Sequence, residues 1–170
     1  AGGPVRAILE AAGLRVHVYT SPYLVRINEC FRIGERDGGR LVSDDGLRRV
    51  LQHCERVNQG EPITIFEIKT AAAFCLFAQH EADVVLLETG LGGRLDATNV
   101  IERPIAVVIT PVSMDHMEFL GDSLAAIAGG QARWSGKASI NAASQVLDKL
   151  SGTVKVIPTD QFIDALASGK

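Results

Sequence analysis

The sequence predicts an α/β domain with a mostly parallel sheet and flanking helices. Two short runs, residues 83–87 and 105–109, are almost entirely apolar and are bounded by polar residues, which is typical of strands buried on both faces. Helical patterns alternate with strand patterns elsewhere along the chain, as they do in parallel α/β sheets. A chain of 170 residues that is 46% apolar is also long enough to bury a substantial core without disulfides or metals.

The first forty residues are expected to hold one helix and one regular strand. Apolar residues at helical spacing predict a helix over 4–13, and Gly13 ends it. Residues 15–19 alternate in polarity as a strand does. Polar residues interrupt the apolar positions of 24–33, so this segment is predicted to be irregular or partly extended, and three glycines mark 34–40 as a surface turn.

Two amphipathic or apolar helices are expected before the first buried run. Ser-Asp-Asp is a helix start signal for the pattern at 43–57, and a second, strongly apolar helix follows at 64–78. After Gly129 the sequence becomes small and polar with little periodicity. Within that tail, the patterns favour a strand at 154–157 and a short closing helix at 160–167.

Composition and charge exclude several classes of protein. The net charge is −3 and the isoelectric point is near 5.8, which disfavours a nucleic-acid binder with a basic face. The sequence has no apolar run of membrane-spanning length and no charged-then-apolar leader, so we expect neither a membrane partner nor secretion. The three cysteines are widely spaced and odd in number, which favours buried thiols in the cytoplasm over a disulfide framework.

The segment after the first buried run carries the most chemistry, with the sequence Glu-Thr-Gly-Leu-Gly-Gly-Arg-Leu-Asp-Ala-Thr-Asn at 88–99. Ligands of parallel sheets collect at the carboxyl ends of the strands. Mg²⁺ takes one or two carboxylates plus substrate oxygens, and glycines let the backbone approach a ligand. Glu88 is therefore the candidate metal ligand. The alternative is a loop that is rich in glycine only in order to turn, with a surface ion pair between Arg94 and Asp96. The other candidate binding residues of this loop are Gly90, Gly92, Gly93, Arg94 and Asp96.

Asp115 and His116 follow the second buried run. Histidine is a common metal ligand and titrates nearest neutral pH, and the predicted strand pair would bring His116 near Glu88. We therefore expect His116 to be a metal ligand and, with Asp115, a catalytic candidate. A lone histidine at a strand end is often structural, and that alternative stays open.

Together these residues resemble the folylpolyglutamate synthase/dihydrofolate synthase family, which are ATP-dependent amide ligases of the Mur ligase superfamily. The most specific similarity lies in 87–121, which holds the glycine-rich segment and Thr-Pro-Val-Ser-Met-Asp-His. Residues 20–24, 28–29 and 63–67 match in the same order, so the resemblance covers roughly residues 5–129.

The resemblance implies a Rossmann-like ATPase domain that phosphorylates a folate or pteroate carboxylate, after which the amino group of glutamate attacks the acyl phosphate. It implies ATP, Mg²⁺ or another divalent cation, and a folate-like small-molecule substrate. By similarity Glu88 and His116 would hold the magnesium. The residues that the resemblance adds to the binding site are Ser21, in a loop facing folate and phosphate, and Asp96, Thr98 and Asn99, which would shape the site.

The chain departs from the family's pattern near both ends. Ala-Gly-Gly-Pro at 1–4 stands where the family has a glycine-rich phosphate loop ending in Gly-Lys-Ser, and Gln131 stands where the family has a lysine that becomes a carbamate. Tyr23 replaces the family's usual histidine. We expect 1–129 to be an incomplete Mur-ligase-like ATPase-domain fragment without the phosphate loop or the C-terminal domain, and 130–170 to be a divergent tail packed on it.

The sequence by itself leaves three functions open. The first is the family's ligation, for which a chain without the phosphate loop is not expected to be competent alone. The second is a metal-dependent hydrolase of an ester, lactone or phosphate that uses Glu88, Asp115 and His116. The third is a non-catalytic interaction module or a homodimer formed through an exposed sheet edge.

Overall fold

The computed structural model describes residues 2–101 and 104–131. The strand predicted at 154–157 and the helix predicted at 160–167 lie outside the described residues. The elements in chain order are α1 (Gly2–Ala11), β1 (Val16–Tyr19), the 3₁₀ turn η1 (Ile27–Cys30), β2 (Phe31–Ile33), β3 (Arg40–Leu41), α2 (Asp44–Asn58), α3 (Ile65–Ala78), β4 (Val84–Leu87), α4 (Met117–Leu120) and α5 (Leu124–Gln131).

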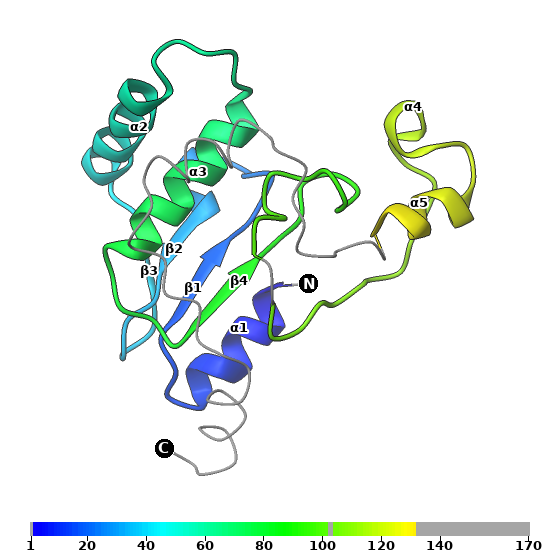
Figure 1. Cartoon of the computed structure of the whole chain (residues 1–170). Helices are drawn as coiled ribbons and strands as arrows, with labels where there is room; N and C mark the ends of the chain where they lie inside the picture. The colour runs from blue at the N-terminus through cyan, green and yellow to red at the C-terminus, as the bar shows by residue number, and fades with distance from the viewer. Residues whose placement is uncertain (1, 102–103, 132–170) are drawn as a thin grey trace.

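The described strands form one four-stranded sheet in the order β3-β2-β1-β4 (Figure 1). β1 is parallel to β4 and antiparallel to β2, and β2 is antiparallel to β3. Tyr19 is in register with Leu87 across the parallel pair, so the carboxyl ends of β1 and β4 lie side by side. The α/β class with flanking helices is confirmed, and among the described strands the sheet is mixed, with its parallel pairing between β1 and β4.

Helices cover both faces of β1. Successive side chains of a strand point to opposite faces. His17 stacks on Phe77 of α3 with 4.7 Å between ring centroids, and the hydroxyl of Tyr19 lies 3.1 Å from that of Thr70, also on α3. Val16 and Val18 are buried on the other face, and α1 packs against β1 and β4 (Figure 1). This layering buries all four residues of β1.

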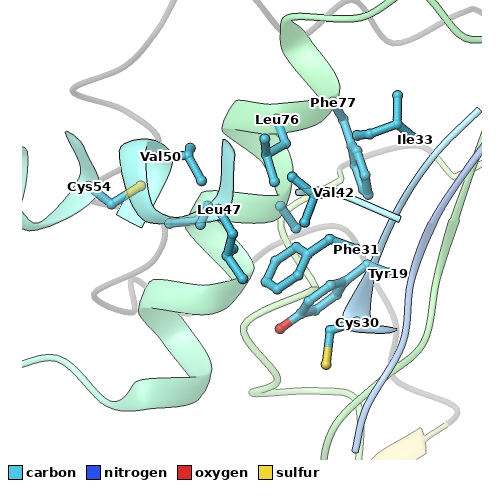
Figure 2. Packing of buried hydrophobic residues seen from close by; sticks show 13 residues of the cluster. Tyr19, Cys30, Phe31, Ile33, Val42, Leu47, Val50, Cys54, Leu76 and Phe77 are labelled. Atoms are coloured by element: carbon cyan, nitrogen blue, oxygen red, sulfur yellow. The ribbon is translucent and has the colours of Figure 1, made fainter. Parts of the chain in front are cut away.

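The main core lies between the sheet and the α2–α3 pair. Figure 2 shows the aromatic rings of Tyr19 and Phe31 from the sheet in one cluster with aliphatic side chains of α2 and α3. The rings of Tyr19 and Phe31 are 5.6 Å apart. All three cysteines are free thiols, and the sulfur atoms of Cys54 on α2 and Cys75 on α3 are 3.9 Å apart within this packing.

The helices α2 and α3 begin at the predicted residues because capping groups are local in sequence. Ser43 accepts a hydrogen bond from the backbone N–H of Gly46 at 3.1 Å, which caps α2. Thr64 and Glu67 form a reciprocal capping box on α3.

No helix in the described ranges is long and apolar enough to cross a membrane.

The strand predicted at 105–109 is wrong. These residues form no strand, and Val107, Val108 and Ile109 expose 48%, 75% and 52% of their surface. The prediction that 83–87 is buried on both faces is also wrong in part, because β1 is the one described strand that pairs with β4 and Val85 is 44% exposed. Apolar composition does not by itself specify strand pairing, because the outer edge of β4 is unpaired among the described strands and 105–109 still forms no ladder with it.

Candidate functional site

The carboxyl ends of β1 and β4 form the centre of the candidate site. The N–H of Glu88 donates to the carbonyl of Tyr19 at 2.9 Å, which continues the parallel pairing by one residue. The backbone N–H of Ser21, in the loop after β1, donates to Oε2 of Glu88 at 3.0 Å. Two predicted site residues that are 67 positions apart in sequence are therefore in direct contact.

Asp96 organises the glycine-rich loop that follows β4. Its side chain is 6% exposed, and Oδ2 accepts the backbone N–H groups of Gly90 at 3.0 Å and Leu91 at 2.8 Å. Oδ1 accepts the backbone N–H and the hydroxyl of Thr98 at 2.9 and 2.5 Å. Arg94 is exposed and makes no ion pair with Asp96, so the alternative of a surface Arg94–Asp96 pair is wrong.

The loop glycines are required by close packing and by backbone conformation. A Cβ atom on Gly90 would lie 2.4 Å from Cζ of Phe66, and one on Gly92 would lie 2.6 Å from Cδ2 of Leu120. Gly92 and Gly93 have φ values of 68° and 135°, which side chains rarely allow. The contact with Leu120 also brings α4 against this loop.

Thr98 and Asn99 are buried beneath the loop. The side-chain amide of Asn99 donates to the carbonyl of Arg94 at 3.1 Å. Its Oδ1 is buried without a hydrogen-bond partner among the described residues. A buried acceptor without a donor costs about 1–3 kcal/mol, whereas the bonds from Thr98 to Asp96 and from the Asn99 amide to Arg94 stabilise the shape of the loop.

Asp115 and His116 lie at the exposed start of α4. His116 adopts a left-handed conformation with φ 48°. Its backbone N–H donates to Oδ1 of Asp115 at 2.8 Å, and its Nε2 is 3.8 Å from Oδ2 of the same residue. The described residues contain no group of three or more His, Cys, Asp or Glu side chains close enough to hold a metal ion. The metal and catalytic roles of His116 and Asp115 stay predictions.

Two charged side chains near this end of the sheet, Glu29 and Lys69, were not among the predicted site residues. Glu29 accepts the backbone N–H groups of residues 24–26 at 2.8–3.1 Å, and these bonds hold the pKa of its carboxyl below the usual value. Lys69 on α3 is only 7% exposed, and its Nζ lies 5.5 Å from the ring centroid of Tyr23. The helix α3 holds two charged residues, Glu67, which belongs to its capping box, and Lys69, so a second charge in a mostly apolar helix was the signal that could have identified Lys69.

Burial dominates the electrostatics beneath this end of the sheet. It raises the pKa of Tyr19 to about 12, against the lowering effect of the hydrogen bond with Thr70. It also raises the pKa of the Cys30 thiol, and the ammonium group of Lys69 opposes that shift. Tyr19 and Cys30 are therefore protonated at neutral pH, so the charges at this site come from Glu29, Glu88, Asp96 and Lys69.

Curated relatives match most of the chain. The dihydrofolate synthase/folylpolyglutamate synthase of Bacillus subtilis is 42% identical over an alignment of 136 positions, which covers 75% of this chain and 30% of that protein. The enzyme of the same name from Haemophilus influenzae is 45% identical over 124 residues, which are 73% of this chain and 27% of that protein. The chain therefore spans about 30% of the length of these relatives. No protein-family model matches the chain.

Solved structures match the same share of the chain. Escherichia coli FolC in complex with DHPP and ADP has a TM-score of 0.69 at 37% identity, over 75% of this chain and 30% of that one. A bifunctional folylpolyglutamate synthase/dihydrofolate synthase from Yersinia pestis, complexed with AMPPNP and Mn, has a TM-score of 0.67 at 40% identity, over 76% and 30% of the two chains. By sequence and by fold, the chain is thus related to the folylpolyglutamate/dihydrofolate synthases over about three quarters of its own length.

Proposed function

We propose that this chain contributes the folate- and cation-binding part of an ATP-dependent folate–glutamate ligase. The single observation that carries the proposal is the carboxylate of Glu88, oriented by the N–H of Ser21 at the common end of β1 and β4. The relatives support it, because the Escherichia coli structure holds DHPP and ADP and the Yersinia pestis structure holds AMPPNP and Mn. Neither the hydrolase nor the interaction module is favoured by a feature of the described residues.

The donor set around Glu88 fits a hard divalent cation. Oε2 accepts the N–H of Ser21, while Oε1 has no hydrogen-bond partner among the described residues. Mg²⁺ is commonly bound by one or two carboxylates, with waters and substrate phosphates completing its octahedron, so one oriented carboxylate is an adequate protein contribution. When bound, the cation would offset the negative charge of the phosphate groups. His116 is proposed as a second ligand on resemblance alone.

The chain's own residues pre-organise this site in two ways. The N–H of Ser21 fixes the direction of the Glu88 carboxylate, and Asp96 holds the N–H groups of Gly90 and Leu91 so that the loop keeps its shape. An oriented first ligand costs less ordering entropy when the cation arrives. Both interactions are made before any ligand binds, so they contribute to affinity by pre-organisation.

Calorimetric titration of the chain with MnCl₂, in the presence and absence of dihydropteroate, tests this proposal. We expect Glu88→Gln to weaken cation binding roughly 10–100-fold, because an amide supplies no negative charge. Glu55→Gln, on the exposed surface of α2, is the matched control and should titrate as the parent chain does. Equal titrations of the parent chain and Glu88→Gln would contradict the proposal. His116→Ala measures whether the histidine is a second ligand.

A further inference from the structure

Lys69 is a buried charged side chain that has no counter-ion among the described residues. Among the described residues Lys69 and Asp96 are the charged groups classed as buried, at 7% and 6% exposure. Asp96 accepts four hydrogen bonds. Lys69 makes no ion pair among the described residues, and its recorded contacts are the neutral Cys30 thiol, with which its ammonium group interacts, and the Tyr23 ring at 5.5 Å. Ammonium groups are almost never buried unless they are paired.

The position of Lys69 places this charge at the candidate site. The next residue on α3, Thr70, lies 3.1 Å from the hydroxyl of Tyr19 at the end of β1. Tyr23, over which Lys69 lies, is two residues beyond Ser21, whose N–H binds Glu88. The ammonium group therefore lies against the loop after β1, which borders the common end of β1 and β4.

The neighbouring carboxylates are engaged elsewhere. Glu29 and Glu88 are near enough that their charges raise the pKa of the Cys30 thiol, which Lys69 lowers. However, Glu29 is directed at the backbone N–H groups of residues 24–26, and Glu88 at that of Ser21. Neither carboxylate lies within 4.0 Å of Nζ of Lys69. One positive charge thus stays unneutralised by direct contact among the described residues.

We propose that Lys69 forms an oxyanion subsite, in which its ammonium group receives a carboxylate or phosphate oxygen of the ligand bound at this strand end. The inference rests on the proposed function for the identity of that ligand. A buried ammonium supplies a strong, weakly screened charge to such an oxygen. Tyr23 is 46% exposed, so the loop that covers Lys69 borders solvent, from which a ligand enters.

The first test measures binding. Lys69→Met keeps the length of the side chain and removes its charge, while Arg48→Met removes one exposed charge from α2 as a matched control. The probes are dihydropteroate, which presents a carboxylate, and ADP, which presents phosphates, each titrated by calorimetry. We expect Lys69→Met to weaken at least one of them about tenfold or more, and Arg48→Met to change neither by more than about twofold. Loss for dihydropteroate alone identifies the carboxylate as the anion, and loss for ADP alone identifies the phosphate.

The second test separates a binding role from a structural one. Because removing an unpaired buried charge relieves a desolvation cost, we expect the Tm of Lys69→Met without ligand to rise. A lysine that only holds Tyr23 in place would instead give a lower Tm. If Lys69→Met has both a lower affinity and a lower Tm, the variant Lys69→Arg, which keeps the charge, separates the two roles. Binding of the probes by Lys69→Arg supports the subsite, and loss of that binding overturns it.

The outcomes distinguish this inference from the proposed function. Unchanged affinity of Lys69→Met for both probes overturns the subsite, while the cation titration of Glu88→Gln still tests the ligase proposal. A parent chain that binds neither probe and no cation overturns both.

Discussion

The carboxylate of Asp96 lies beneath a loop of glycines and accepts hydrogen bonds from three backbone N–H groups and one hydroxyl. The sequence suggested a ligand-binding or surface residue at this position, and the family resemblance suggested a residue that shapes the site; in the structure its hydrogen bonds order the loop. Gly90, Gly92 and Gly93 provide the space and the backbone angles, and Asp96 provides the bonds. At the scale of single residues, the site is built from groups that support one another.

The substitution Asp96→Asn tests this role. Asparagine has one acceptor oxygen in place of two, so either the N–H groups of Gly90 and Leu91 or the two donors of Thr98 lose their acceptor. We expect the free energy of unfolding to fall by about 1–3 kcal/mol, measured by urea denaturation. Asp45→Asn, on the exposed first turn of α2, is the control and should change stability by no more than about 1 kcal/mol. Equal effects of the two substitutions would contradict the loop-ordering role.

The helix α3 is the element that joins the core to the site. The Thr64–Glu67 capping box starts the helix. Phe66, Lys69 and Thr70, from its first two turns, lie near the ends of β1 and β4. Phe66 lies against Gly90, and Thr70 against Tyr19. The rest of α3 packs into the cluster shared with α2 and the sheet (Figure 2). Displacement of this helix would therefore change both the core and the site.

We expect Thr64→Ala to destabilise the chain by about 0.5–2 kcal/mol. The hydroxyl of Thr64 accepts a hydrogen bond from the backbone N–H of Glu67 at 3.2 Å, and the carboxylate of Glu67 accepts one from the backbone N–H of Thr64 at 2.9 Å. Chemical denaturation measures the loss. Ser113→Ala, in an exposed loop, removes a hydroxyl without a capping bond and should be close to neutral; a loss as large as that of Thr64→Ala would count against the cap.

At the scale of the whole molecule, β1 ties the layers together through a buried histidine. Nδ1 of His17 accepts the N–H of Gly34 at 2.9 Å, so its Nε2–H donates to the carbonyl of His80 at 3.2 Å. The ring also stacks on Phe77. Desolvation by burial lowers the pKa of His17 below its ordinary value of 6.5. The native state therefore holds this ring neutral.

This lowered pKa predicts how stability depends on pH. Below pH 6.5 the unfolded chain binds a proton at His17 that the folded chain does not, so stability is complete above pH 6.5 and falls as pH decreases. The slope from this group is at most about 1.4 kcal/mol per pH unit. Denaturation measured between pH 7.5 and 5.5 should show the free energy of unfolding decrease as pH falls. His17→Gln should make this pH dependence flatter, whereas the control His53→Gln, on the exposed side of α2, should leave it unchanged. A slope unchanged by His17→Gln would refute this assignment.

Much of the fold was predictable where its determinants are local. Ser43 and Thr64 cap the two helices within three residues of themselves, so α2 and α3 begin where expected. Glu88 follows β4 directly, and its place at a strand end followed from the sequence order alone. By contrast, β2 and β3 are only three and two residues long and therefore carry too little periodicity to be recognised. The unpaired state of 105–109 depends on tertiary pairing, which propensity does not identify.

By itself, the sequence determined the local elements, the chemical groups available and the family resemblance, because caps, periodicity and motifs are read from neighbouring residues. The tertiary structure alone decided which of these groups meet. It joined Ser21 to Glu88 across 67 residues, placed Phe66 against Gly90, and buried Lys69 against Tyr23 with no counter-ion among the residues that the structure describes. Such contacts depend on strand pairing and helix packing between distant segments, and the cost or gain of a buried charge exists only once that packing has excluded water.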